Sequence, residues 1–234
     1  DENLTPLMMG EMPSPFQSMA MATGFTETVE FWQFAATGPR MIGRRNGNPR
    51  RVKLWKKGFD CLWRQHGVWD VDEATGEPVL LKRDYFAQAN GRSVDFHEDY
   101  LKPFQLRFAQ ELRSAHPNAL IFLEAPVLSE PAEWHEEDPS GIVHATHWYD
   151  YATLLTKQYR SWVGVDFRTQ RPVFFARNVQ RIFREQLASL KNEAEAYLQG
   201  APTLIGEIGI PFDMAQGKSF RSGNFNKQVQ AMDR

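Results

Sequence analysis

Apolar runs typical of buried strands alternate with amphipathic helical patterns over the second half of the chain, and this alternation limits the fold more than any other feature. The apolar runs cover residues 119–127, 142–150 and 204–210, and the helical patterns cover residues 95–115 and 173–198. Strands that alternate with helices predict a parallel sheet with right-handed crossovers. We therefore expect an α/β fold in this half of the chain.

Both helical patterns have recognisable ends. Asp95 is a credible N-cap, and Glu98 stands three residues later, as in a capping box. Pro103 should kink this first helix or divide it into a short lead-in and a main helix. Pro172 suits the start of the second helix and Gly200 its end. The apolar face of the first helix is predicted to consist of Phe96, Tyr100, Phe104, Phe108, Leu112 and Ala115.

Residues 1–94 show no sustained period, but they hold too many large apolar side chains for a free linker. We expect an ordered insertion that packs its rings against a scaffold or around the opening of a ligand site, and packing is the commoner role. The clustered methionines and aromatic residues are Met8, Met9, Met12, Met19, Met21, Phe25, Phe31, Trp32 and Phe34. The chain is therefore divided into an insertion over residues 1–94 and an α/β region over residues 95–234.

The composition excludes some partners. A net charge of −2 argues against nucleic acid as the main partner. The one basic cluster, residues 40–57, is broken by glycine and proline and is interpreted as a solvated loop, with transient contact to a membrane surface as the minor alternative. No apolar run approaches the roughly 20 residues that span a bilayer. Neither a metal nor a cofactor is expected.

The single cysteine, Cys61, excludes an internal disulfide and fits a reducing compartment, so a cytoplasmic location is favoured. No signal peptide is visible at the start of the chain. Because the chain opens on Asp1 without an initiator Met, we expect it to begin inside a longer sequence.

One carboxylate interrupts the last apolar run. Glu207 stands between Gly206 and Gly209, and an ionised carboxylate in a buried strand is costly unless it has partners. The two glycines leave room for another molecule or another backbone to approach. A strand-end Glu paired with a neighbouring Arg is the structural alternative.

The other two apolar runs also end in polar or aromatic groups. Glu124 lies near the end of one, and His147, Trp148 and Tyr149 end the other. In a (β/α)8 (TIM) barrel, the carboxyl ends of the strands form the face that carries the chemistry. Three such groups at corresponding positions favour a functional role for Glu207.

These motifs resemble a known family. A strand ending in His-x-Tyr, followed one helix later by a strand with an apolar-Gly-Glu-x-Gly run, resembles family 5 of the retaining glycoside hydrolases. More narrowly, the chain resembles the endoglycoceramidase-related branch, which includes fungal glucosylceramidases and steryl-β-glucosidases. The stretches that carry this resemblance are Met12-Pro-Ser-Pro-Phe-Gln-Ser18, Cys61-Leu-Trp-Arg-Gln-His-Gly-Val-Trp69, Leu123-Glu-Ala-Pro126 and His147-Trp-Tyr-Asp150.

The resemblance implies that the chain supplies about strands five to seven of a (β/α)8 barrel, preceded by the long insertion. It also implies double displacement with Glu207 as the nucleophile, Tyr149 holding Glu207 by a hydrogen bond and His147 lining the same pocket. A glycolipid or another β-glucoside would be the substrate, and further segments would complete the barrel. Further candidates for substrate binding are Trp148, Glu124, Phe212, Trp63, His66 and Trp69.

The chain departs from the family at the second carboxylic acid. The family's acid/base Glu lies in an Asn-Glu-Pro motif after the fourth barrel strand, and the only internal Asn-Glu here, Asn192-Glu193, is followed by Ala on a helix. The chain alone should therefore be inactive. Three readings stay open: a β-glucosidase for glucosylceramide or a steryl glucoside, a non-catalytic sugar- or lipid-binding relative, and an endo-β-glucanase.

Overall fold

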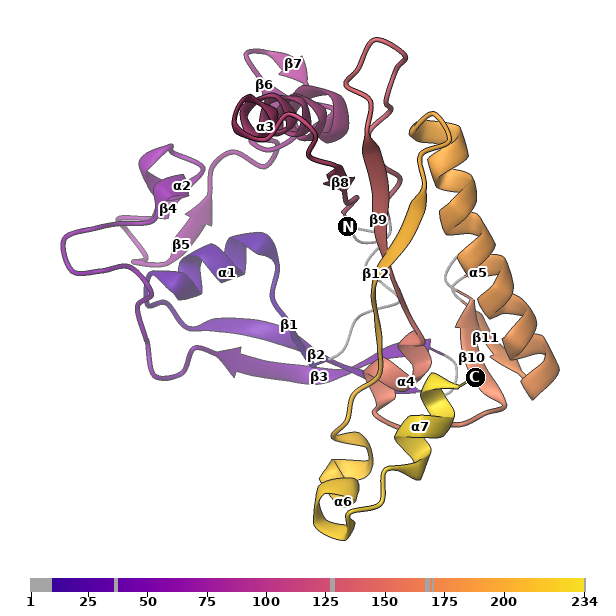
Figure 1. The fold of residues 1–234 in the computed structure, drawn as a ribbon. Helices are drawn as coiled ribbons and strands as arrows, with labels where there is room; N and C mark the ends of the chain where they lie inside the picture. The colour runs from indigo at the N-terminus through magenta and orange to yellow at the C-terminus, as the bar shows by residue number, and fades with distance from the viewer. Residues whose placement is uncertain (1–9, 36–37, 127–128, 167–168, 170, 234) are drawn as a thin grey trace. The chain divides into compact units, whose positions relative to one another are not determined.

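The computed structural model describes residues 10–35, 38–126, 129–166, 169 and 171–233, and it divides into two compact units (Figure 1). Unit 1 is Asp1–Val94 and unit 2 is Asp95–Arg234. Met8 and Met9 lie outside the described residues, as does the side chain of Phe34.

Unit 1 is built on an antiparallel sheet in which β2 pairs with both β1 and β3. The elements are β1 (Gly10–Met12), α1 (Pro15–Ala22), β2 (Glu27–Ala35) and β3 (Gly38–Gly47). Helix α1 begins at Ser14, whose side chain accepts the backbone N–H of Gln17, while the Gln17 side chain accepts the N–H of Ser14. This reciprocal capping box stabilises the first turn.

The basic cluster is only partly a loop. Residues 40–47 lie in β3, so the interpretation of the whole cluster as a loop was wrong. Gly43, one of the residues that suggested a loop, pairs with Phe31, and the register then shifts so that Met41 pairs with Trp32. Such a bulge tolerates a glycine without ending the strand.

The rest of unit 1 consists of a short helix and short paired strands around an aromatic core. They are α2 (Leu62–Gln65), β4 (Trp69–Val71), β5 (Pro78–Leu80), β6 (Gln88–Ala89) and β7 (Arg92–Ser93), with β4 paired to β5 and β6 to β7. Trp69 is fully buried beside Cys61 and Val68, and the rings of Phe16 and Phe25 meet it edge-on.

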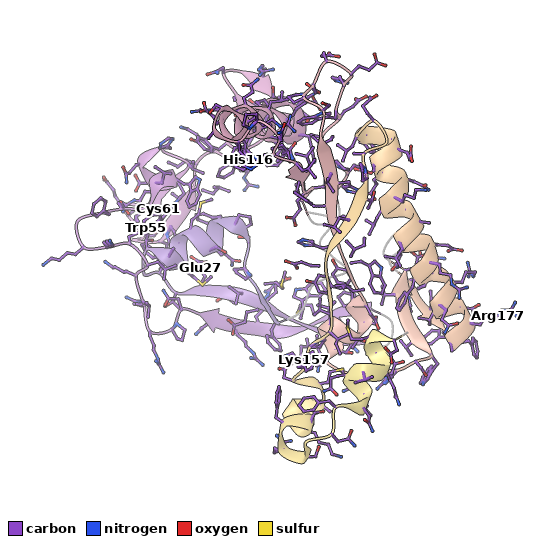
Figure 2. All side chains as sticks on the ribbon, in the orientation of Figure 1. Glu27, Trp55, Cys61, His116, Lys157 and Arg177 are labelled. Atoms are coloured by element: carbon purple, nitrogen blue, oxygen red, sulfur yellow. The ribbon has the colours of Figure 1, made fainter. Side chains whose placement is uncertain are left out.

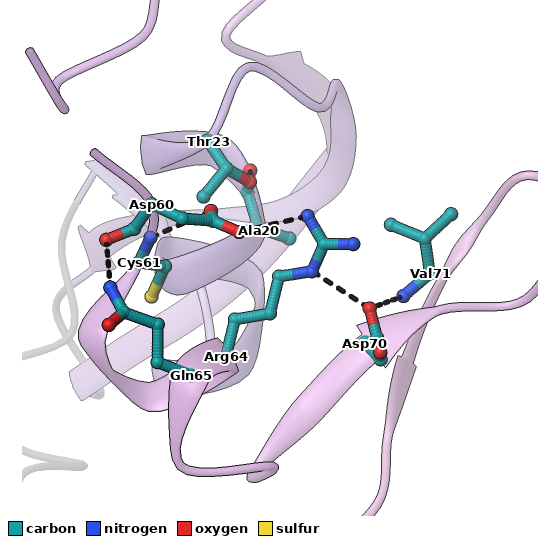
Figure 3. A network of polar contacts seen from close by, with 8 residues as sticks. All are labelled: Ala20, Thr23, Asp60, Cys61, Arg64, Gln65, Asp70 and Val71. Atoms are coloured by element: carbon teal, nitrogen blue, oxygen red, sulfur yellow. Dashed lines mark hydrogen bonds and ion pairs between the residues drawn. The ribbon is translucent and has the colours of Figure 1, made fainter. Parts of the chain in front are cut away.

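A polar network ties α2 to β4 at the surface of this core (Figure 3). Arg64 contacts Asp60 at 3.1 Å and Asp70 at 2.8 Å. The backbone N–H of Val71 and the Arg64 guanidinium together lower the pKa of Asp70. Asp60 also accepts the backbone N–H of Cys61, so both carboxylates are already engaged within unit 1.

Unit 2 contains the predicted parallel sheet, in the order β8-β9-β12. Its strands are β8 (Ile121–Leu123), β9 (Ile142–Tyr149) and β12 (Thr203–Gly209). In Figure 1 the long helix α5 (Ala176–Tyr197) runs beside β12. The α/β fold is thus confirmed, and the strand order follows the chain order, as neighbouring strands of a barrel do.

Helices cover one face of this sheet. Ile121 and Leu123 of β8 are buried against Ala109 of helix α3 (Lys102–Ala115) and Leu198 at the end of α5. Side chains alternate along a strand, so Phe122 faces the opposite way and is 54% exposed. The residues from β9 and β12 that share this open face with Phe122 are therefore Val143, Ala145, His147, Tyr149, Leu204 and Glu207.

The first predicted helix is divided, as Pro103 suggested. A π-helical turn, η2 (His97–Leu101), leads into α3 (Lys102–Ala115). Asp95 accepts the N–H groups of His97 and Glu98 as expected, but its own N–H bonds to Asp99, so the expected capping partner Glu98 was wrong.

The predicted apolar face of that helix is exposed. The exposed fractions of Phe104 and Phe108 are 65% and 50%, and their rings stack on each other. Buried instead are Lys102 and Gln105, with Ala109. Among the described residues, the helix thus packs its polar and small side chains inward.

The second predicted helix starts later than expected. Pro172 lies in a hairpin of β10 (Val163–Asp166) and β11 (Arg171–Phe174), and α5 begins at Ala176. The hairpin packs closely on α5 at Gly164. Gly200 does follow the helix, with φ of 70°, and donates its N–H to Ala194.

Gly164→Ala should destabilise unit 2 by about 1–3 kcal/mol, because overpacking a core forces neighbours apart. A Cβ there would lie 2.8 Å from Cγ1 of Val179, which is fully buried. The free energy of unfolding in urea measures this. Gly43→Ala is the matched strand control, since a Cβ at Gly43 meets nothing within 4 Å. Equal effects of the two changes would contradict the packing argument.

Three short helices complete unit 2. They are α4 (Tyr151–Thr156), α6 (Met214–Ser222) and α7 (Asn226–Met232). The expected loop over residues 217–223 was wrong because α6 extends to Ser222, after a left-handed stretch at residues 215–217. The helix expected from residue 226 is present. Across the described residues, no helix is both long and apolar enough to cross a bilayer.

Candidate active site

The candidate site lies where β9 and β12 end side by side. Glu207 is the register partner of His147, and Gly209 is the partner of Tyr149. The register shifts between Ile205 and Glu207, which leaves Gly206 as an extra residue in β12. Such a bulge changes which way the next side chain points, and here it places Glu207 on the open face with His147 and Tyr149.

Two side chains of β9 hold Glu207. The hydroxyl of Tyr149 donates a short hydrogen bond to Oε2 of Glu207. Nδ1 of His147 lies 3.5 Å from the same oxygen. The hydrogen bond to Glu207 raises the pKa of Tyr149, which keeps its phenol protonated as a donor. The predicted contact between Tyr149 and Glu207 is therefore present.

His147 also connects Glu207 to Glu124. Nδ1 of His147 lies 3.1 Å from Oε1 of Glu124, the residue that directly follows β8. One imidazole nitrogen thus approaches two carboxylates from two different strands. A ring N–H at this nitrogen can donate to either carboxylate, so His147 links the residue after β8 to the residue on β12.

The glycines beside Glu207 lie under the rings of the same two residues. A Cβ on Gly206 would be 3.7 Å from Cδ2 of His147, and one on Gly209 would be 3.7 Å from Cε1 of Tyr149. A methyl group at either glycine would make ordinary van der Waals contact with these rings, so the space that the glycines leave is small and is bounded by side chains of the chain itself.

The expected burial of Glu207 was wrong. Its side chain is 55% exposed, and the exposed fractions of Glu124 and His147 are 56% and 30%. Leu204, an apolar residue of β12 on the same face, is 49% exposed. The apolar run predicted a strand covered on both faces, but helices cover only one face of this sheet among the described residues.

Trp148 is not brought to the carboxylates. It points to the helical side of the sheet, where its ring meets Phe183 edge-on and its indole N–H donates to Gln186 of α5. Glu193 lies on that side as well, with Oε2 4.0 Å from Nε2 of the buried His144. Burial raises the pKa of Glu193, and this residue does not replace the missing acid/base group of the family motif.

The remaining candidates lie in other parts of the chain. Phe212 follows β12, is 55% exposed and packs near Phe225. Trp63, His66 and Trp69 belong to unit 1, where Trp69 is core and His66 hydrogen-bonds Tyr85 at 2.7 Å. Their role in substrate binding stays a prediction.

Asp150 lies next to the site, and the sequence patterns assigned no role to it. It is buried and caps α4, accepting the backbone N–H and the hydroxyl of Thr153. This cap turns the chain sharply after Tyr149 and fixes the end of β9. The signal was available, since Asp150 and Thr153 have the spacing of an N-cap.

Among the described residues, no group of three or more His, Cys, Asp or Glu side chains is arranged to hold a metal ion. The site consists of two carboxylates, an imidazole and a phenol at the carboxyl edge of a parallel sheet. A carboxylate held at such an edge is one of the two acidic groups with which glycoside hydrolases work.

Solved structures agree with this class. The chain matches a crystal structure of sterylglucosidase 1 from Cryptococcus neoformans, with tris, at a TM-score of 0.83 and 30% sequence identity. The match covers 97% of this chain and 36% of the sterylglucosidase chain.

Curated relatives carry names of the same kind. A glucosylceramidase of Aspergillus fumigatus is 32% identical and an ergosteryl-β-glucosidase of Saccharomyces cerevisiae is 27% identical, each over 97% of this chain. The chain spans about a third of the length of these relatives, 34% of each. No model of a protein family matches the sequence. The chain is a homologue of glucosylceramidases and steryl glucosidases, which confirms the resemblance seen in its motifs.

Proposed function

We propose that this chain carries the nucleophile of a retaining β-glycosidase that hydrolyses the β-glucosidic bond of a glycolipid, either glucosylceramide or a steryl glucoside. The observation that supports this most is the placement of Glu207, held by Tyr149 and His147 at the carboxyl edge of three parallel strands. The homology to enzymes named for these two substrate classes supports the same proposal.

In this proposal the sheet is part of a (β/α)8 barrel, and β8, β9 and β12 are about its fifth to seventh strands. The face that bears Phe122, Leu204 and the carboxylates would be the barrel interior. Its exposure within this chain is what a barrel segment would show before the other strands cover it. Trp148 and the helices would lie on the outer side.

The chemistry follows from the charge and position of Glu207. One carboxylate oxygen attacks the anomeric carbon, the bond to the aglycone oxygen breaks, and that oxygen takes a proton from a second carboxylic acid. Water then cleaves the glycosyl ester, giving up its proton to the same second group. The hydrogen bond from Tyr149 orients Glu207 and leaves its other oxygen available for attack.

The second carboxylic acid of a retaining enzyme lies about 5–5.5 Å from the nucleophile. Family resemblance assigns this role to an Asn-Glu-Pro motif, which this chain lacks. Glu124 is then a pocket residue that, through His147, adds negative charge near Glu207. A sugar- or lipid-binding relative without turnover is the competing function, and a full-length sequence without the Asn-Glu-Pro motif would favour it.

Covalent trapping separates the two functions. An activated 2-fluoro β-glucoside, reacted with an active preparation of the protein, should esterify Glu207, and peptide mass spectrometry should find the label on residues 203–209. A label on another carboxylate would remove Glu207 from the nucleophile role. A protein that binds the glucoside reversibly and never becomes labelled would be the binding relative.

Tyr149→Phe should lower kcat about tenfold to hundredfold with little change in KM, because a hydrogen bond to a charged group contributes about 1.5–3 kcal/mol. Steady-state kinetics with an aryl β-glucoside measures this. Tyr100→Phe is the control, since Tyr100 is 51% exposed and lies on η2, which carries none of the residues that hold Glu207. If both variants kept the parent kcat, the hydrogen bond would have no catalytic role.

A further inference from the structure

The segment that joins β3 to α2 in unit 1 combines exposed apolar side chains with a dense group of cations. Residues 50–59 read Arg-Arg-Val-Lys-Leu-Trp-Lys-Lys-Gly-Phe. Leu54 is 77% exposed, Phe59 is 72% exposed and Val52 is 54% exposed. Exposed apolar side chains that lie together and are surrounded by polar residues are a common mark of a protein or membrane contact surface.

The backbone of this segment is fixed, so the apolar side chains do not fold back onto the core. The Asn48 amide donates to the carbonyls of Met21, Phe25 and Val52, and its oxygen accepts the N–H of Val52. The N–H of Leu54 bonds to the carbonyl of Ala22 in α1. These bonds to the preceding helix present the segment as a rigid surface.

A second turn fixes Phe59. Its N–H bonds to the carbonyl of Lys56, and Gly58 between them has φ of 89°, a conformation that glycine adopts at low cost. Trp55, labelled in Figure 2, lies between Leu54 and Phe59 in the sequence and is partly buried with the aromatic core. The two most exposed apolar side chains of the segment are thus anchored on either side of a partly buried Trp.

The cations of the segment have no ion pairs within the part of the chain that the structure describes. They are Arg50, Arg51, Lys53, Lys56 and Lys57. The nearest carboxylate in sequence, Asp60, is engaged by Arg64 and by the N–H of Cys61 (Figure 3). The segment therefore presents unneutralised positive charge, although the whole chain has a net charge of −2.

A cavity of about 890 Å³ opens beside the same cations. Five cations and two carboxylates line it together with Trp55, so its lining has a net positive charge; they are Arg51, Lys53, Lys56, Lys57, Arg64, Asp60 and Glu77. The indole N–H of Trp55 is buried and has no acceptor in the described structure. Because this nitrogen is buried, a ligand in the cavity would be held by the cations and not by the indole N–H.

We propose that residues 50–59 dock on an anionic lipid bilayer. Leu54 and Phe59 enter the boundary between headgroups and acyl chains, while the lysines and arginines contact headgroup phosphates, one of which reaches the cavity beside Trp55. A surface that joins exposed apolar side chains with several cations is what binds anionic membranes. This inference does not rest on the proposed glycosidase function, because vesicle binding is measured without turnover.

Vesicle sedimentation tests the proposal. The chain should pellet with vesicles that contain about 30% phosphatidylserine and much less with pure phosphatidylcholine. Raising NaCl from about 0.1 M to about 0.5 M should weaken binding, since exposed charges are screened. Equal binding to both vesicle types, or no binding to either, would overturn it.

Two pairs of substitutions separate the apolar and charged contributions. Leu54→Ser with Phe59→Ser, and separately Lys56→Glu with Lys57→Glu, should each weaken binding by about tenfold or more. Arg177→Glu with Arg184→Glu on α5 is the matched charge control, and Phe104→Ser, 65% exposed in the parent, is the apolar control. If the control pair weakened binding as much, general charge and not this segment would be responsible.

A site-specific probe tests insertion directly. Because Cys61 is buried, Leu54→Cys provides a single accessible thiol for an environment-sensitive fluorophore. The emission should shift to the blue with anionic vesicles and stay unchanged for the same label on Arg177→Cys. An unshifted label at residue 54, as expected if another protein segment covers this surface, would overturn the proposal.

Discussion

Replacing Glu207 by Gln should reduce kcat on an aryl β-glucoside by roughly 10⁶-fold, because losses of this order follow when a hydrolase loses its nucleophile. The amide keeps the size of the side chain but cannot form the glycosyl ester. Steady-state kinetics on the active protein measures the change. Turnover within about tenfold of the parent would remove Glu207 from the nucleophile role.

Chemical rescue distinguishes a lost nucleophile from a damaged fold. Glu207→Ala should regain turnover with azide and a dinitrophenyl β-glucoside, since azide can occupy the vacated space, form the new bond at the anomeric carbon and displace dinitrophenolate. The product should be the α-glycosyl azide, opposite in configuration to the substrate. Glu185→Gln on α5, with a side chain 58% exposed, is the control that should keep parent activity.

Lys102→Met should lower the free energy of unfolding by about 3–5 kcal/mol at pH 7, because it leaves a buried carboxylate without its partner. Lys102 Nζ lies 3.0 Å from Oδ2 of Asp138, and each side chain is only 10% exposed. Urea unfolding measures the loss. Lys157→Met is the matched control: its pair with Asp213 is about half exposed and should contribute at most about 1 kcal/mol.

The pKa of Asp138 determines how the stability lost in Lys102→Met should change with pH. Burial alone would raise the pKa of Asp138, but the N–H of His135 and the Lys102 ammonium outweigh it and hold the pKa below its usual range. A lowered pKa stabilises the folded state above the unfolded pKa of about 3.9, and this contribution disappears as the pH falls through the folded pKa. The gap between parent and Lys102→Met should therefore narrow at acid pH.

A double variant tests whether the unpaired charge of Asp138 causes the loss of stability in Lys102→Met. Lys102→Met with Asp138→Leu removes both charges and should recover most of the lost stability. If the double variant were as unstable as Lys102→Met alone, packing around the methylene chain of Lys102 would explain the loss instead.

Strand positions were predictable because three short apolar runs bounded by polar residues have few alternative structures. The carboxyl-edge cluster followed from topology, since parallel strands that follow one another place their ends together. The contact between Tyr149 and Glu207 could therefore be expected from the amino-acid sequence. The N-cap contact of Asp150 with Thr153 could also have been expected, from the spacing of these two residues.

Other features depended on contacts that a linear pattern does not contain. The stripe of Phe104 and Phe108 satisfies the helical period, yet a buried ion pair involving Lys102 selects the opposite side of α3. Arg44 and Arg45 lie in a stretch of cations and glycines whose composition is typical of a loop, but pairing with β2 makes them part of a strand. In both cases tertiary contacts overrode a local preference.

Gly206 is a single extra residue in β12, and it reverses the alternation of side chains between the two faces of the sheet. Before it, odd-numbered residues such as Ile205 lie on the helical side; after it, odd-numbered Glu207 lies on the other side. Odd-numbered residues before Gly206 and odd-numbered residues after it therefore lie on opposite faces of the sheet. Before the shift, Ile205 can face the helices that pack on the sheet. After the shift, Glu207 faces the opposite side, beside the imidazole of His147 and the phenol of Tyr149.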